Sequence, residues 1–106
     1  MSGVTEMRQR YQLPSGFSAY RKIGPFDADS LPAGLLREHR LKEGTWANLT
    51  VLAGEIGFVW DDPGDDRATT VLAAGDSMTV PPTILHHLEV QEEGFSLEIE
   101  FLNASY

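Results

Sequence analysis

The chain has 106 residues, which suits one domain whose core needs no disulfide or structural metal to hold it together. It has no cysteine, so disulfides and thiolate ligands are excluded and any metal must be bound by nitrogen or oxygen atoms. A net charge of -8, with no stripe of Lys or Arg, argues against nucleic acid as a partner.

The sequence also shows no sign of a membrane or secretory protein. No apolar run approaches the roughly 18 residues of a membrane span. The N-terminus lacks the apolar region and small-residue cleavage site of a secretory signal. We therefore expect a cytoplasmic protein with no membrane partner.

The N-terminal part begins without a clear hydrophobic period. We expect residues 1–12 to form an arm that crosses onto a neighbouring subunit, and residues 13–106 to form the single domain. Alternation predicts a short strand over Phe17–Ile23. We expect another short strand over Leu35–Leu41, which carries His39.

The remaining sequence predicts further short strands with turn residues between them. About eight strands spaced near ten residues apart, with no amphipathic helix, indicate an all-β sandwich or barrel. The strands expected after His39 are Thr45–Leu52, Glu55–Trp60, Ala68–Leu72, Ser77–Val80, His86–Val90 and Phe95–Leu102.

Four aspartates lie close together around Pro63 and Gly64. Their spacing lacks the register of a calcium-binding loop, which alternates oxygen ligands and closes on a glutamate. We expect a solvated hairpin loop. The four are Asp61, Asp62, Asp65 and Asp66.

The stretch GDSMTVPPTILHH, residues 75–87, combines a turn, a strand, two prolines and two histidines. The two prolines leave the backbone little freedom, so His86 can be aimed into a cavity from a rigid corner. His87 points to the opposite face of the strand, which we expect to be solvent or a subunit surface.

This stretch also carries a resemblance to a known family. Gly75, Pro81 and His86 fit the second motif of the cupins, and only the motif's inner glycine is replaced, by Thr83. Gly54 lies where a cupin has the glycine that closes its first motif. More specifically, the chain resembles the small single-domain cupins of the DUF1971 family, the TehB/YeaR-like, tellurite-resistance type. The matching stretches are YRKIGPF, LPAGLLREH, KEGTW, LTVLAGEIGF, VPPTILHHLEV and LEIEF.

The resemblance implies a cupin double-stranded β-helix, a jelly-roll barrel, often in a homodimer, with a metal site at its mouth. His39 and His86 lie on the family's two motif histidines, and Glu100 falls on an acidic position of its last strand. The usual set of three histidines and a glutamate is absent, since Ala47 stands at the expected carboxylate. The resemblance therefore implies a divalent transition metal, Zn, Fe, Ni or Mn, held by two histidines and one carboxylate, or a vestige of such a site.

The alternation of side chains along a strand limits which carboxylate can join the two histidines as the third metal ligand. Glu98 and Glu100 share one face of the last strand, while the apolar residues share the face that a barrel interior normally takes. This counts against Glu100 unless the strand is kinked. Glu43 is the alternative, because parity puts it on the same face as His39.

Three functions remain open from the sequence. The first is a metal-dependent, dioxygenase-type enzyme acting on a small organic substrate. The second is a protein that binds or senses a metal or small molecule without turnover. The third is a structural dimer whose metal site is vestigial.

Overall fold

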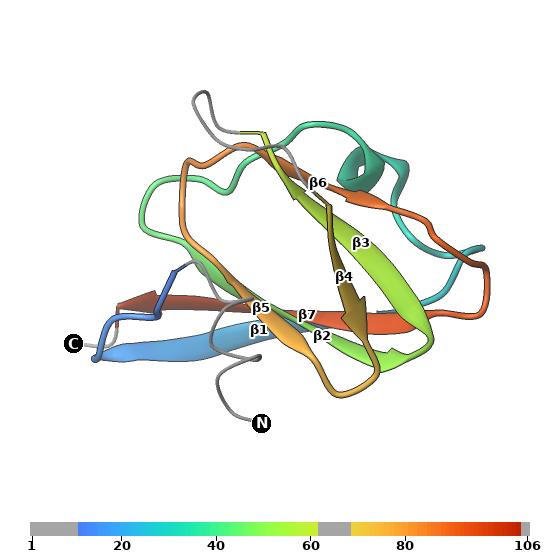
Figure 1. Ribbon diagram of the computed structural model, residues 1–106. Coiled ribbons are helices and arrows are strands. Elements are labelled where there is room, and N and C mark those ends of the chain that lie inside the picture. The colour runs from blue at the N-terminus through green and yellow to red at the C-terminus, as the bar shows by residue number, and fades with distance from the viewer. Residues whose placement is uncertain (1–10, 62–68, 105–106) are drawn as a thin grey trace.

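The computed structural model describes residues 11–61 and 69–104, and in this part the chain forms seven strands and one short 3-10 helix (Figure 1). Most of the arm predicted over residues 1–12 lies outside these ranges, as do Asp62, Asp65 and Asp66 of the acidic loop. The elements are β1 (Phe17–Phe26), η1 (Ala33–Leu36), β2 (Trp46–Ala53), β3 (Glu55–Trp60), β4 (Thr69–Ala73), β5 (Ser77–Val80), β6 (His86–Glu89) and β7 (Ser96–Ala104).

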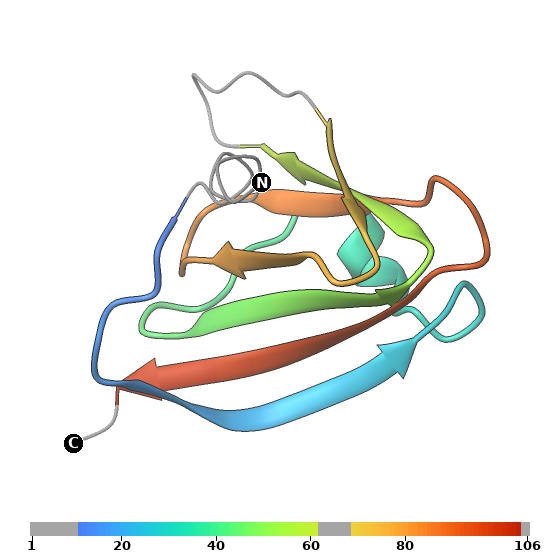
Figure 2. The same ribbon diagram turned by 60° about the horizontal axis from the view of Figure 1, so that its bottom comes forward.

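The strands form two antiparallel sheets that face each other. One sheet has the order β1-β7-β2-β5 and the other the order β4-β3-β6. Figure 2 shows the first sheet with its four strands side by side. The chain moves from one sheet to the other after β2, β4, β5 and β6, and this interleaving is the arrangement of a jelly roll. The prediction of an all-β jelly-roll fold is confirmed.

Alternation along the strands produces the core between the sheets. In β2, buried Ala47, Leu49 and Val51 alternate with half-buried residues that face outward. In β3 every residue after Glu55 is buried, so this strand is covered on both faces. The largest fully buried side chains are Phe58, Phe95, Ile56, Leu72, Met78, Leu97 and Val51.

The turn between β2 and β3 depends on Gly54. Its φ of +64° lies in the left-handed region, and a Cβ atom there would lie 2.7 Å from the carbonyl oxygen of Gly94. Only glycine fits this close approach without movement of the backbone. The glycine that the sequence assigns to the first cupin motif therefore has a local structural reason.

The strand predicted over Leu35–Leu41 is wrong. Pro32 precedes the single 3-10 turn of η1, and the chain becomes extended only at Arg37, with φ of -118° and ψ of 157°. After that, His39 forms one isolated bridge with His86. Leu35, His39 and Leu41 of this stretch line the same cavity, although the backbone forms no continuous ladder.

Candidate binding site

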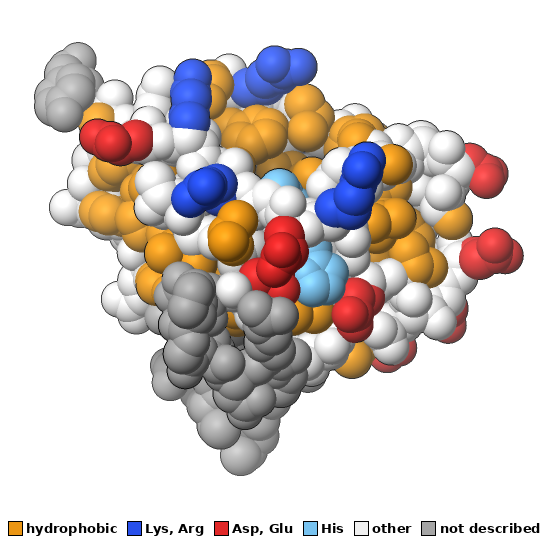
Figure 3. Space-filling model, turned by 90° about the horizontal axis from the view of Figure 1, so that it is seen from above, with side chains coloured by type: hydrophobic (Ala, Val, Ile, Leu, Met, Phe, Trp, Pro, Cys, Tyr) orange, Lys and Arg blue, Asp and Glu red, His pale blue; other side chains and the backbone are white. Residues whose placement is uncertain are grey.

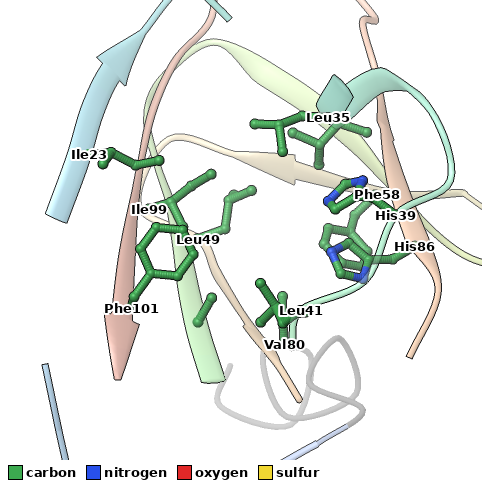
Figure 4. A pocket seen from close by; sticks show the side chains of 12 residues that line it. Ile23, Leu35, His39, Leu41, Leu49, Phe58, Val80, His86, Ile99 and Phe101 are labelled. Carbon is green, nitrogen blue, oxygen red and sulfur yellow. The ribbon is translucent and has the colours of Figure 1, made fainter. Parts of the chain in front are cut away.

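A cavity lies between the two sheets, with about 80 Å³ of space open to the centres of water-sized molecules. Both sheets contribute to its walls, and the segment after η1 closes one side (Figure 4). Its walls are apolar except for two histidines. The lining residues are Ile23, Leu35, His39, Leu41, Ala47, Leu49, Phe58, Val80, His86, Leu88, Ile99 and Phe101.

The loop between β5 and β6 positions His86. Pro81 is buried at the end of β5, and Thr83 adopts a φ of +70°, which reverses the chain. The backbone N–H of Thr83 donates to the carbonyl oxygen of Leu41 over 2.9 Å, tying this loop to the segment that carries His39. The loop therefore brings the two histidine-bearing segments together.

The two histidines lie directly opposite each other. The backbone N–H of each donates to the carbonyl oxygen of the other, both over 2.9 Å. Their ring centroids are 4.2 Å apart, with 66° between the ring planes. Phe58 stacks on His86 at 5.4 Å, so the aromatic core fixes the orientation of that ring (Figure 4). His39 and His86 are thus the predicted site residues that the structure brings together.

The hydrogen bonds of the two rings determine which nitrogen is available. Nδ1 of His39 lies 2.8 Å from the carbonyl oxygen of Arg37, and Nδ1 of His86 lies 2.8 Å from that of Ile84. A carbonyl oxygen can only accept, so Nδ1 carries the proton and donates in both rings. Whenever such a ring is uncharged, its Nε2 bears a lone pair that can accept a hydrogen bond or bind a metal.

His86 is held neutral by its surroundings. Burial lowers its pKa from 6.5 to about 4, the hydrogen bond to Ile84 opposes this shift, and the nearby His39 lowers the pKa further. Only 4% of the residue is exposed. At neutral pH His86 therefore offers an uncharged Nε2 acceptor.

The two predicted carboxylate ligands lie away from this cavity. Glu100 is on the face of β7 opposite to Ile99, where its backbone neighbours are Lys22 and Asn48. Glu43 is exposed in the turn before β2. The segment from His39 to Glu43 is not a strand, so strand parity does not place Glu43 on the same face as His39. Within residues 11–61 and 69–104, no three His, Asp or Glu side chains gather closely enough to hold a metal ion.

A second polar cluster, which the sequence did not predict, lies on the outer face of the β4-β3-β6 sheet. Asp61 is buried, not solvated, and its Oδ2 lies 2.6 Å from Nδ1 of His87. Nε2 of His87 lies 3.4 Å from Glu89, whose other oxygen accepts from Thr69 over 3.0 Å. Burial would lower the pKa of His87, but its hydrogen bonds to Asp61 and Glu89 and the negative charges of these carboxylates outweigh it and raise that pKa. In the antiparallel register of β3 and β6, His87 lies opposite Val59, so Asp61, two residues further along the chain, is on the same face of the sheet.

Fold and cavity together define a small jelly-roll protein of the cupin type, with a pocket between its sheets. Residues 21–99 match the profile of the TehB-like domain, and the chain belongs to this family. The resemblance that the sequence motifs indicated is confirmed.

Solved structures show the same fold. TehB from Haemophilus influenzae aligns with a TM-score of 0.76 at 25% identity, over 85% of this chain and 32% of that chain. The present chain thus spans about a third of the TehB chain. A protein from E. coli strain K12 aligns with a TM-score of 0.79 at 20% identity, over 91% of this chain and 99% of that chain.

No match was found among curated proteins. Across the described residues, no helix has the length and apolar character needed to cross a bilayer.

Proposed function

We propose that this protein binds a small organic molecule in the cavity between its sheets, with His39 and His86 as the polar contacts. One observation carries the proposal: two imidazoles, each with Nδ1 fixed on a backbone carbonyl, line a cavity whose other walls are apolar. Small-molecule sites are commonly concave and apolar, with a few fixed polar groups that orient the ligand.

Each part of the cavity has a distinct role in this proposal. Apolar side chains such as Leu49 and Ile99 take the body of the ligand out of water. Nε2 of His39 or of His86 accepts a hydrogen bond from a hydroxyl or similar donor on the ligand. Because both rings are already oriented by their backbone hydrogen bonds, binding fixes few additional protein groups.

The test uses 1-octanol, which has an apolar body and one hydroxyl donor, in a calorimetric titration. We expect binding at one site and loss of binding in Ala47→Leu, which fills the cavity from β2. The matched control is Ala74→Leu, at an exposed position outside the cavity. Absence of binding to the wild type, or equal binding to a cooperatively unfolding Ala47→Leu variant, would overturn the proposal.

A second candidate function is binding of a divalent transition metal, Zn, Fe, Ni or Mn, at the histidine pair. The Nδ1 hydrogen bonds favour it, because metal-binding histidines usually donate their other ring N–H to a carbonyl or carboxylate. The donor set fits in type but comprises only two protein ligands, so the small molecule itself would complete the coordination. When bound, the metal would polarise a ligand oxygen as a Lewis acid.

Elemental analysis of the native protein tests this second candidate. We expect stoichiometric metal in the wild type and its loss in His39→Ala and in His86→Ala. The control is His87→Asn, which removes a histidine from the opposite face of β6. A metal-free wild type, or equal metal content in all four proteins, would contradict the candidate.

A further inference from the structure

The positive charges of the described residues lie in two short segments of the sequence, residues 21–22 and 37–42. Along the sequence, every Lys and Arg in residues 11–61 and 69–104 lies at most two residues from one that lines the cavity. Arg21 and Lys22 precede Ile23, Arg37 and Arg40 flank His39, and Lys42 follows Leu41.

Figure 3 shows a face of the molecule on which Lys and Arg side chains stand around an area of hydrophobic side chains, with histidine, Asp and Glu side chains beside it. All five basic residues are exposed, so their charges are available to a ligand that enters from solvent.

One of the five differs from the others in its pairing. Lys22 lies 3.5 Å from the carboxylate of Glu98 on β7. Within the described part of the chain, the other four form no ion pair. We call these four residues the basic rim: Arg21, Arg37, Arg40 and Lys42.

Acidic residues, both near the basic rim and in the chain as a whole, oppose the positive charge of the rim. Glu38 and Glu43 are exposed beside it, but they are fewer than the four cations of the rim. The chain as a whole carries a net charge of -8, so its long-range field repels anions. Attraction of an anion at this mouth therefore depends on the local excess of positive charge, which acts within about 10 Å at ordinary salt.

We propose that the ligand of the cavity is an amphipathic organic anion, with an apolar body between the sheets and a carboxylate or similar head group at the basic rim. This rests on the proposed function, because it assigns a chemical class to the molecule bound there. The apolar walls explain the body, and arginine is the side chain best suited to bind a carboxylate with two hydrogen bonds.

The experiment compares three probes of equal chain length: octanoate, 1-octanol and octylammonium. Octanoate has no hydrogen to donate to Nε2 of His39 or His86, so the comparison sets attraction by the rim against the hydrogen bond that 1-octanol makes. At low salt we expect the rim to dominate, so that octanoate binds about tenfold more tightly than 1-octanol and octylammonium binds most weakly. The advantage of octanoate over 1-octanol should shrink as salt is added. Equal affinity for octanoate and 1-octanol, or tighter binding of octylammonium, would overturn the proposal.

The double variant Arg37→Gln/Arg40→Gln tests the rim directly. We expect it to bind octanoate about fivefold more weakly than the wild type and to bind 1-octanol unchanged. The matched control is Lys22→Gln, which removes a charge already paired with Glu98 and should have a smaller effect. An equal loss of affinity for octanoate and 1-octanol would show that the variant damaged the cavity, and would contradict a role for the charges.

The outcomes separate this proposal from the one on which it rests. If neither octanoate nor 1-octanol binds, the cavity is not a small-molecule site and both proposals fail. If 1-octanol binds as tightly as octanoate and the rim variants change nothing, the anion proposal fails and the proposed binding function stands.

Discussion

His86 and His87 are neighbours in the sequence but have opposite electrostatic environments. Strand alternation turns His86 into the apolar cavity, where burial lowers its pKa to about 4. It turns His87 outward onto the carboxylates of Asp61 and Glu89, which raise its pKa. The motif register predicted the inward histidine correctly. Asp61 was assigned to the loop because it adjoins other aspartates, and no local pattern distinguishes it from them.

The lowered pKa of His86 predicts an acid-sensitive stability. Between pH 6.5 and about 4, the unfolded chain binds a proton at His86 that the folded chain does not. The free energy of unfolding should therefore decrease as the pH falls through this range, by roughly 3 kcal/mol in total from this residue. Urea unfolding of the wild type and of His86→Phe at several pH values measures the difference.

The variant His86→Phe should show a shallower acid dependence than the wild type. Phenylalanine keeps a ring beside Phe58 but binds no proton. His87 acts in the opposite sense in both proteins, because its raised pKa contributes stability at low pH that is lost as the pH rises through its folded pKa. The same acid dependence in the two proteins would contradict a neutral, buried His86.

At the scale of the element, the loop from β5 to β6 and the segment after η1 act as one unit. The hydrogen bond from Thr83 to Leu41 and the mutual bridge of His39 and His86 tie the two together. Such pairings between distant segments leave no trace in local alternation. The sequence therefore predicted a strand around His39, whereas the chain forms a 3-10 turn and a single bridge.

Replacement of Thr83 by glycine should stabilise the protein. Thr83 stands where the cupin motif has glycine, and its φ of +70° lies in the left-handed region that is unfavourable for a β-branched residue. We expect Thr83→Gly to raise the free energy of unfolding by about 1 kcal/mol, after the entropy cost of glycine is counted. Denaturant unfolding of the two proteins measures this.

A matched comparison is Thr83→Ala, which removes the β-branch but keeps a Cβ atom. It should gain less than Thr83→Gly, because the left-handed conformation remains strained for alanine. A loss of stability in Thr83→Gly would show that the threonine side chain itself supports the loop.

At the scale of the whole molecule, the sequence predicted the jelly roll well and the cavity only in part. Buried and less buried residues alternate along strands such as those around Leu49 and Ile99, and this local pattern determines which face of each strand turns toward the core. Strand parity already counted against Glu100, which lies on the face of β7 away from the cavity. The exclusion of Glu43 depends on how distant segments pack, which a single sequence does not encode locally. The homodimer, the cytoplasmic location and the metal ligands stay predictions.

The central claim is that His39 and His86 present acceptor nitrogens to a ligand in the cavity. The most direct test follows the imidazole nitrogens of ¹⁵N-histidine-labelled protein by NMR during titration with 1-octanol. We predict Nδ1–H tautomers for both residues and a change in their Nε2 signals on binding, with His87 unchanged as the internal control. Nε2–H tautomers, or signals that stay constant at His39 and His86 while octanol binds, would contradict the account.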